Sequence, residues 1–276
     1  MKKILILVLI FTFMCSMLAS CTDVPPLLEN DDASPLLENE DARPLLESAD
    51  AEFAKAPRTV EMSMKFSSDS KFIQDRLAVM NMELPMVIDG ENVSISTSQK
   101  TPGQSIPTYI NVMIVDDVMY FSVSNFRGKS RVKATISEEQ YQELMEEGNG
   151  NMIAAPEDFG EMTVKSEGEK KYISCDNISA EKLESLNNAM GETLDDILGK
   201  IKYEPSVAEV TFDIILNQGR YERIDMLYAY FVVMDGQSFR ITMEFSAEIS
   251  YDYVAPIIAP SDADEYRKIS FDEFLN

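Results

Sequence analysis

The sequence predicts an α+β fold built on one strongly curved antiparallel sheet of about eight strands or more, with two or three helices against its concave face. Three patterns support this prediction. Short segments with alternating apolar residues occupy much of residues 59–175. A long apolar stripe at helical spacing runs from Leu183 to Ile201. Three long segments rich in β-branched and aromatic residues follow between residues 207 and 251, separated by tight-turn signals.

Alternation of apolar and polar residues assigns the first strands. In Val60–Phe66 every second residue is apolar, which is typical of a strand with one buried side. Further strands are expected at residues 92–98, 109–115, 118–123 and 130–136, with Asp116-Asp117 as a hairpin turn. A short helix is expected over residues 70–82, because apolar residues recur there at a spacing that suits a helix. These residues are Phe72, Ile73, Leu77, Met80 and Met82.

Two helices and a hairpin are predicted for the middle of the chain. Ser137 and Gln140 have the spacing of a capping box, which begins a helix that Gly148-Asn149-Gly150 ends. Residues 161–165 and 170–175 favour a hairpin around Glu167-Gly168. The longest helix begins at Ser179, and its apolar stripe comprises Leu183, Leu186, Met190, Leu194, Ile197, Leu198 and Ile201.

Three long strands are predicted at residues 207–216, 221–234 and 238–251. Gln218-Gly219 and Asp235-Gly236 separate them as tight turns, so the strands form an antiparallel meander. Residues 59–276 are therefore expected to form a single domain that is long enough for a substantial core.

The N-terminus has the pattern of a secretory signal that ends at a lipidated cysteine. Two lysines precede an apolar run from Ile4 to Met14, which is shorter than the roughly 20 residues of a membrane-spanning helix. Leu18-Ala19-Ser20-Cys21 then resembles the bacterial lipobox. This motif implies that residues 1–20 are a removed signal peptide. It also implies that Cys21 carries a diacylglyceryl group, which anchors the protein to the extracytoplasmic side of the bacterial cell membrane.

Residues 21–58 are predicted to be a disordered acidic tether that begins at the lipidated Cys21. The motif Pro-Leu-Leu-Glu occurs three times at nine-residue intervals, beginning at Pro26, Pro35 and Pro44. Three short copies are too few for a solenoid, and high charge with low apolar content favours disorder. The segment is interpreted as a spacer, and docking of the repeats onto a partner is the alternative.

The residue content excludes several kinds of active site. The chain has no histidine, which rules out Ser-His-Asp and Cys-His arrangements and histidine metal ligands. Cys15 leaves with the signal and Cys21 carries lipid, so Cys175 has no disulfide partner and is interpreted as a small buried residue. A formal charge of −24 argues against binding to nucleic acid. No catalytic residue, metal ligand or cofactor is predicted, and the protein is not expected to be an enzyme.

Acidic pairs give no recognisable cation site. Asp116-Asp117, Asp195-Asp196 and Asp262-Ala263-Asp264 lack the spacing of an EF-hand loop. The first pair is interpreted as a turn and the second as an exposed helix face.

The order of elements and the C-terminal residues resemble a known family. Ala259-Pro260-Ser261-Asp262-Ala263-Asp264-Glu265-Tyr266 follows the last long strand. Residues Ile258–Tyr266 match the ending of Gram-positive lipoproteins related to the LolA/LppX-like superfamily of carriers. The resemblance covers about residues 59–266 in element order and includes no defining catalytic or ligand motif. It implies a half-open β-barrel whose apolar hollow, between the sheet and the helices, holds acyl chains in relatives.

The methionine content favours an adaptable apolar site. Of the 17 methionines, those expected on apolar faces of the domain are Met62, Met64, Met80, Met82, Met86, Met113, Met119, Met190, Met226, Met234 and Met243. The leading hypothesis is a lipid-anchored, non-catalytic lipoprotein that binds or carries a hydrophobic, lipid-like ligand, with the ligand-binding residues unassigned. Two alternatives remain open. One is an envelope protein–protein interaction module with a filled, methionine-rich core, and the other is a carboxylate-based hydrolase acting on wall polymers.

Overall fold

The computed structural model describes residues 41–99, 106–137, 140, 161–176, 202–234 and 236–275. The strands are β1 Arg58–Ser68, β2 Met82–Asp89, β3 Asn92–Gln99, β4 Thr108–Val115, β5 Val118–Asn125, β6 Gly128–Thr135, β7 Met162–Glu167, β8 Lys170–Cys175, β9 Lys202–Asn217, β10 Arg220–Met234, β11 Gln237–Ser250 and β12 Arg267–Lys268. The helices are α2 Ala42–Lys55, α3 Lys71–Leu77 and α6 Phe271–Leu275, with 3-10 turns η2 Ala78–Met80 and η4 Ala263–Glu265.

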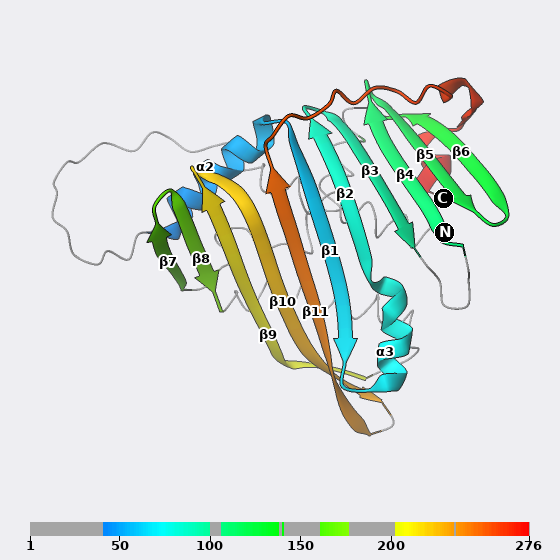
Figure 1. The fold of residues 1–276 in the computed structure, drawn as a ribbon. Coiled ribbons are helices and arrows are strands. Elements are labelled where there is room, and N and C mark those ends of the chain that lie inside the picture. Colours follow the sequence, from blue (N-terminus) through cyan, green and yellow to red (C-terminus); the bar gives the residue numbers. More distant parts are fainter. Residues whose placement is uncertain are drawn as a thin grey trace.

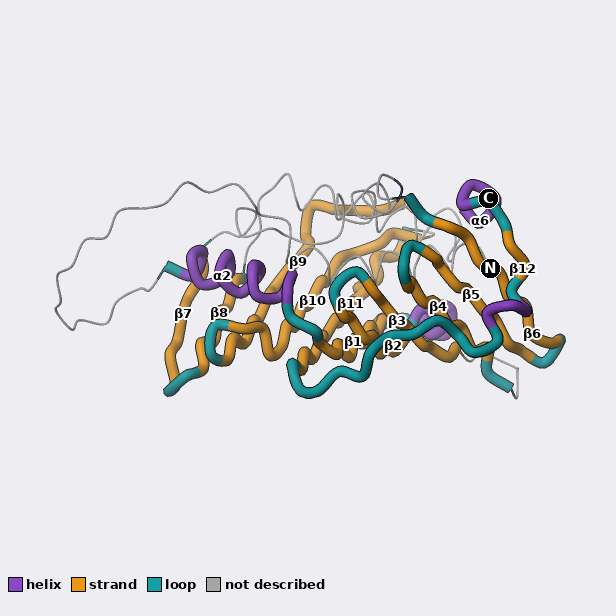
Figure 2. The backbone as a smooth tube through the Cα atoms, turned by 90° about the horizontal axis from the view of Figure 1, so that it is seen from above, coloured by secondary structure: helices purple, strands orange, loops and turns teal. Residues whose placement is uncertain are grey.

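All twelve strands belong to one sheet, in the order β12-β6-β5-β4-β3-β2-β1-β11-β10-β9-β8-β7. The sheet is strongly curved and open, with β12 and β7 at its two ends (Figures 1 and 2). The predicted α+β class and curved, half-open sheet are therefore confirmed. One detail differs from the all-antiparallel prediction, because β12 pairs with β6 in parallel.

One face of the sheet forms the core. On β1, Val60, Met62, Met64 and Phe66 are buried, whereas Glu61 and Lys65 point to the other face and are exposed. Helices α2, α3 and α6 contribute buried residues to the same apolar cluster, among them Leu46, Ile73 and Phe274. Figure 2 shows α2 and α6 on the concave side. The helices therefore cover the concave face, as the sequence predicted, although only α3 among them was predicted.

The predicted hairpin turns are confirmed by backbone angles. Asp116 and Asp117 have φ of 48° and 61°, and Gln218 and Gly219 have φ of 52° and 74°. Two successive positive φ angles are the geometry of a type I′ turn, whose twist matches that of the flanking strands. The predicted capping box is also present, because Ser137 and Gln140 exchange hydrogen bonds of 3.0 and 3.2 Å between backbone amides and side-chain oxygens. The predicted helix beginning at Ser179 lies outside the described residues.

The predicted boundary between tether and domain at residue 59 is wrong. Residues 42–55 form α2, and Ala42, Leu46, Ala49 and Phe53 along its inner side are at most 2% exposed. The third Pro-Leu-Leu-Glu copy therefore belongs to the fold. The prediction of disorder was based on the high charge of the whole segment. The apolar residues of α2, however, recur at spacings of three and four, which is typical of an amphipathic helix. Residues 21–40, with Cys21 and the first two copies, lie outside the described residues.

Strand β2 was also missing from the sequence prediction. The predicted helix over residues 70–82 corresponds to α3 and η2, and β2 begins at Met82. Pro85 lies within this strand, and a proline has no N–H for a ladder, which argues against a central strand. The strand forms nevertheless, because it pairs with β1 over seven residues. Its pairing with β3 covers only four residues.

The C-terminal segment, defined here as the strap, comprises residues 251–266. It follows one edge of the sheet (Figure 1) and lies on its convex side (Figure 2). Ile257 and Tyr266 pack with Val115 and Tyr120 in a second apolar cluster, separate from the core. The acidic C-terminal residues join the strap to the sheet, because the Asp262 carboxylate forms an ion pair of 3.2 Å with the guanidinium of Arg131 on β6. The strap then leads into β12, which pairs with the outer edge of β6.

Candidate functional site

The concave face of the central strands is a continuous apolar surface rich in methionine. We define the methionine face as Met62 and Met64 on β1, Met86 on β2, Met226 on β10 and Met243 on β11, none more than 4% exposed. The strand register interleaves these residues with aromatic ones. Phe245 on β11 lies opposite both Met64 and Met226. Flexible thioether side chains next to flat rings suit an apolar surface that must fit variable shapes.

The other predicted methionines have several different positions. Met80 on η2 and Met119 on β5 are buried in the same core cluster. Met82 is half-buried and packs against that cluster. Met113 packs with the apolar cluster under the strap, on the convex side of the sheet and not with the concave core. The reason is register, because β4 directs Ile110 and Val112 inward and therefore Met113 outward. Met190 and the side chain of Met234 lie outside the described part.

A buried polar contact closes the methionine face at the end of β10 that lies under α2. The hydroxyl group of Tyr221 donates a hydrogen bond of 2.7 Å to the Asp50 carboxylate, and Asp50 is only 4% exposed. The ring of Tyr221 also meets that of Phe53 edge-on, with centroids 5.9 Å apart. Arg220 forms an ion pair of 3.1 Å with Glu52 at the surface. Helix α2 is therefore held to β10 by both apolar and polar contacts.

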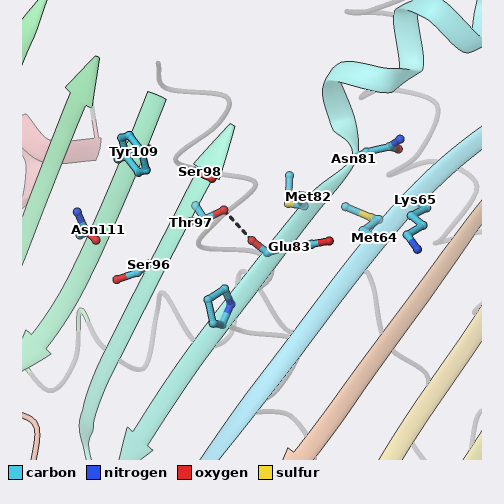
Figure 3. A pocket seen from close by; sticks show the side chains of 11 residues that line it. Met64, Lys65, Asn81, Met82, Glu83, Ser96, Thr97, Ser98, Tyr109 and Asn111 are labelled. Carbon is cyan, nitrogen blue, oxygen red and sulfur yellow. Dashed lines mark hydrogen bonds between the residues drawn. The ribbon is translucent and has the colours of Figure 1, made fainter. Parts of the chain in front are cut away.

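The sheet has a split between β2 and β3. Their paired register begins at Asp89↔Asn92 and ends at Met86↔Ile95. Beyond that point β2 remains paired with β1 as far as Met82, and β3 remains paired with β4 as far as Gln99. The ladder between the two strands therefore stops while both strands continue, and the strands diverge (Figure 3).

A pocket of about 660 Å³ lies at this split. Figure 3 shows the residues that line it, which are Met64, Lys65, Asn81, Met82, Glu83, Pro85, Ser96, Thr97, Ser98, Tyr109 and Asn111. The hydroxyl group of Thr97 donates a hydrogen bond of 2.7 Å across the split to the carbonyl oxygen of Glu83. The lining therefore combines two methionines of the core with a rim of amide, hydroxyl and charged groups.

A second hollow, of about 420 Å³, lies over β1, β9, β10 and β11. Here the ladder is continuous, with β1 and β11 paired from Thr59↔Ser250 to Ser68↔Ile241. Arg223 donates a hydrogen bond of 2.7 Å to the Asp225 carboxylate, and this bond, with the attraction of that charge, raises the pKa of Arg223 above its ordinary value. The hollow is a surface depression in which Arg223 is paired with the carboxylates of Asp225 and Glu248.

The described residues offer no evident metal centre. Among them, no group of three or more cysteine, aspartate or glutamate side chains is placed to hold a metal ion. Asp116 and Asp117 occupy the β4–β5 turn, as predicted, and Cys175 is 3% exposed at the end of β8, which confirms its buried position. In the described part of the chain, no helix is long and apolar enough to cross a membrane.

Comparisons with known proteins do not identify a family for this chain. No protein-family model matches the chain, and no curated protein sequence matches it. Among solved structures, LprF from Mycobacterium bovis aligns with a TM-score of 0.34 and 11% sequence identity, over 80% of this chain and 96% of that chain. A TM-score this low carries no argument about fold or function. The resemblance to LolA/LppX-like carriers therefore stays a prediction.

Proposed function

We propose that this chain is an extracytoplasmic lipoprotein, anchored through Cys21, which binds or carries a hydrophobic, lipid-like ligand on the methionine face without catalysing a reaction. The observation that supports this proposal is the combination of an open, curved sheet with a concave face of interleaved methionine and aromatic residues. A surface of this kind accepts apolar chains with little demand on their exact shape. The lipobox supports the anchor, because lipidation would hold the domain beside a membrane, where such ligands are found.

Native mass spectrometry tests the binding function. The chain from residue 21 onward, carrying Cys21→Ser, is purified from a bacterial host, weighed intact and extracted with organic solvent. A stoichiometric co-purifying lipid or fatty acid is the expected result. An apo mass that is unchanged after incubation with phosphatidylglycerol vesicles would overturn the carrier function.

A substitution on the methionine face distinguishes a ligand hollow from a filled core. Ala247 on β11 is 1% exposed and faces Met62 on β1 and Ile224 on β10. If a ligand occupies the space above it, Ala247→Phe displaces the ligand and leaves the protein stable. If side chains fill that space, the same substitution lowers stability by about 1–3 kcal/mol. Thr242→Phe, on the opposite face of the same strand, is the matched control.

The second candidate is an envelope protein–protein interaction module. The observation that favours it is a set of exposed apolar side chains at one end of the sheet. Tyr109 at the start of β4 is 50% exposed, Phe126 in the β5–β6 turn is 56% exposed, and Ile106 just before β4 is 50% exposed. A clean apo mass together with a destabilised Ala247→Phe variant would favour this candidate.

A further inference from the structure

We infer that the split between β2 and β3 is a lateral opening through which the acyl chain of a single-chain amphiphile reaches the methionine face, while the polar head stays at the outer rim. This inference rests on the proposed binding function. It concerns the route of the ligand and the site of its head group, which the binding function by itself leaves open.

The primary sequence explains why the ladder stops at this position. The last β2–β3 pair is Met86↔Ile95, and the next residue of β2 is Pro85. A proline has no N–H, so it cannot donate the next hydrogen bond of a ladder. Prolines are found in sheets where a strand edge is unpaired, and here that edge lies inside the sheet. The opening is therefore built into the sequence of β2.

Residues from both faces of the sheet meet at the opening. Met82 packs against the concave core cluster and also lines the pocket. Lys65, Glu83 and Ser96 line the same pocket but are exposed on the convex side. In Figure 3 the side chain of Met82 lies in the space between the diverging strands. This geometry differs from the hollow over β11, whose strands are joined by a continuous ladder.

The polarity of the lining specifies the ligand class. Its floor consists of the thioethers Met64 and Met82, which suit an acyl chain. Its rim carries the amides of Asn81 and Asn111, the hydroxyl of Ser98 and further polar groups, all able to hydrogen-bond a polar head. A pocket of about 660 Å³ is within the usual range for a small-molecule site. An amphiphile with one chain and a hydrogen-bonding head matches both parts.

The Thr97 hydroxyl group acts as a bridge across the opening. Its hydrogen bond of 2.7 Å to the carbonyl oxygen of Glu83 takes the place of a missing ladder bond. Passage of a chain between the strands would break this single bond, whereas passage through a paired region would break several. Thr97→Val keeps the shape of the side chain and removes the bridge. We expect it to speed uptake by about 2- to 10-fold, the value of one net hydrogen bond.

A reversible cross-link tests the route directly. Glu83→Cys with Ser98→Cys places two thiols on the two strands that border the opening, beyond the ladder, and keeps Pro85 in place. The chain runs from residue 21 onward and also carries Cys21→Ser and Cys175→Ala. Uptake of cis-parinaric acid, a fluorescent fatty acid, is followed by stopped flow in the oxidised and the reduced protein. We expect uptake to be at least about tenfold slower when the disulfide is closed and to recover on reduction.

The matched control is Val87→Cys with Ser94→Cys, a pair that lies opposite within the existing ladder. Its disulfide should leave uptake unchanged, because these strands are already joined there. Equal rates for the oxidised and reduced Glu83→Cys/Ser98→Cys protein would overturn the lateral route while leaving the binding function intact. Absence of probe binding by the protein without the added cysteines would instead overturn the binding function, and the route with it.

Discussion

Replacing Leu46 with alanine tests whether α2 belongs to the folded domain. Leu46 is completely buried, in the third Pro-Leu-Leu-Glu copy, and joins the core cluster of the concave face. Removing a fully buried leucine side chain lowers the free energy of unfolding by about 2–5 kcal/mol, through lost transfer energy and the cavity left behind. A typical domain has only about 5–15 kcal/mol in total, so the effect is large.

The repeats supply their own controls. Leu28 and Leu37 occupy the position equivalent to Leu46 in the first and second copies. If those copies form the tether that the sequence predicts, Leu28→Ala and Leu37→Ala leave the free energy of unfolding unchanged. The three substitutions are chemically identical and fall at the same position of the Pro-Leu-Leu-Glu motif.

Urea denaturation measures this difference. The chain has no tryptophan, so far-UV circular dichroism follows loss of the sheet. With a slope of about 2–3 kcal/mol per molar urea, Leu46→Ala should lower the midpoint by roughly 1 M or more. In thermal melts each kcal/mol corresponds to about 2–4 °C at this chain length. A Leu46→Ala midpoint equal to that of the unsubstituted protein would refute the placement of α2 in the cooperative core.

Three further substitutions probe other contacts. Tyr221→Phe should lower the free energy of unfolding by about 1.5–3 kcal/mol, because the buried Asp50 carboxylate loses a hydrogen-bond donor, and an unchanged urea midpoint would contradict this. Arg131→Ala should cost less than about 1 kcal/mol, since its ion pair with Asp262 is near the surface, but it should release the strap. Limited proteolysis should then cut within residues 251–266, and unchanged resistance would count against the ion pair as a clasp. Asp117→Gly should raise stability by about 0.5–1 kcal/mol, because glycine tolerates the positive φ at this turn, and a lower melting temperature would argue against the turn geometry.

Local chemistry was sufficient to predict many elements of this fold. Asp116-Asp117 and Gln218-Gly219 adopt the positive φ angles expected for tight hairpins. Ser137 and Gln140 form the expected reciprocal hydrogen bonds. Alternation located β1 and most other strands, and it correctly assigned which side of β1 is buried. These features depend on residues a few positions apart, so the sequence displays them directly.

Helix α2 and strand β2 escaped prediction because tertiary contacts overrode the local signals. Helix α2 lies in an acidic segment, and its narrow stripe of small and apolar residues gains stability by packing against the sheet, chiefly β10. Strand β2 contains Pro85, which argues against a central strand, but its pairing with β1 holds it in the sheet. In both cases the partner is distant in the sequence or not evident from local composition.

The sequence by itself determined the turns, the alternation of most strands and the apolar character of the face that became concave. The tertiary structure alone decided which strands are neighbours, such as β1 and β11, which are separated by most of the domain. It also decided that the strap reaches β6 and adds a parallel strand there. The physical reason is that a two-residue period specifies the face of each side chain, whereas the identity of the neighbouring strand depends on long-range pairing.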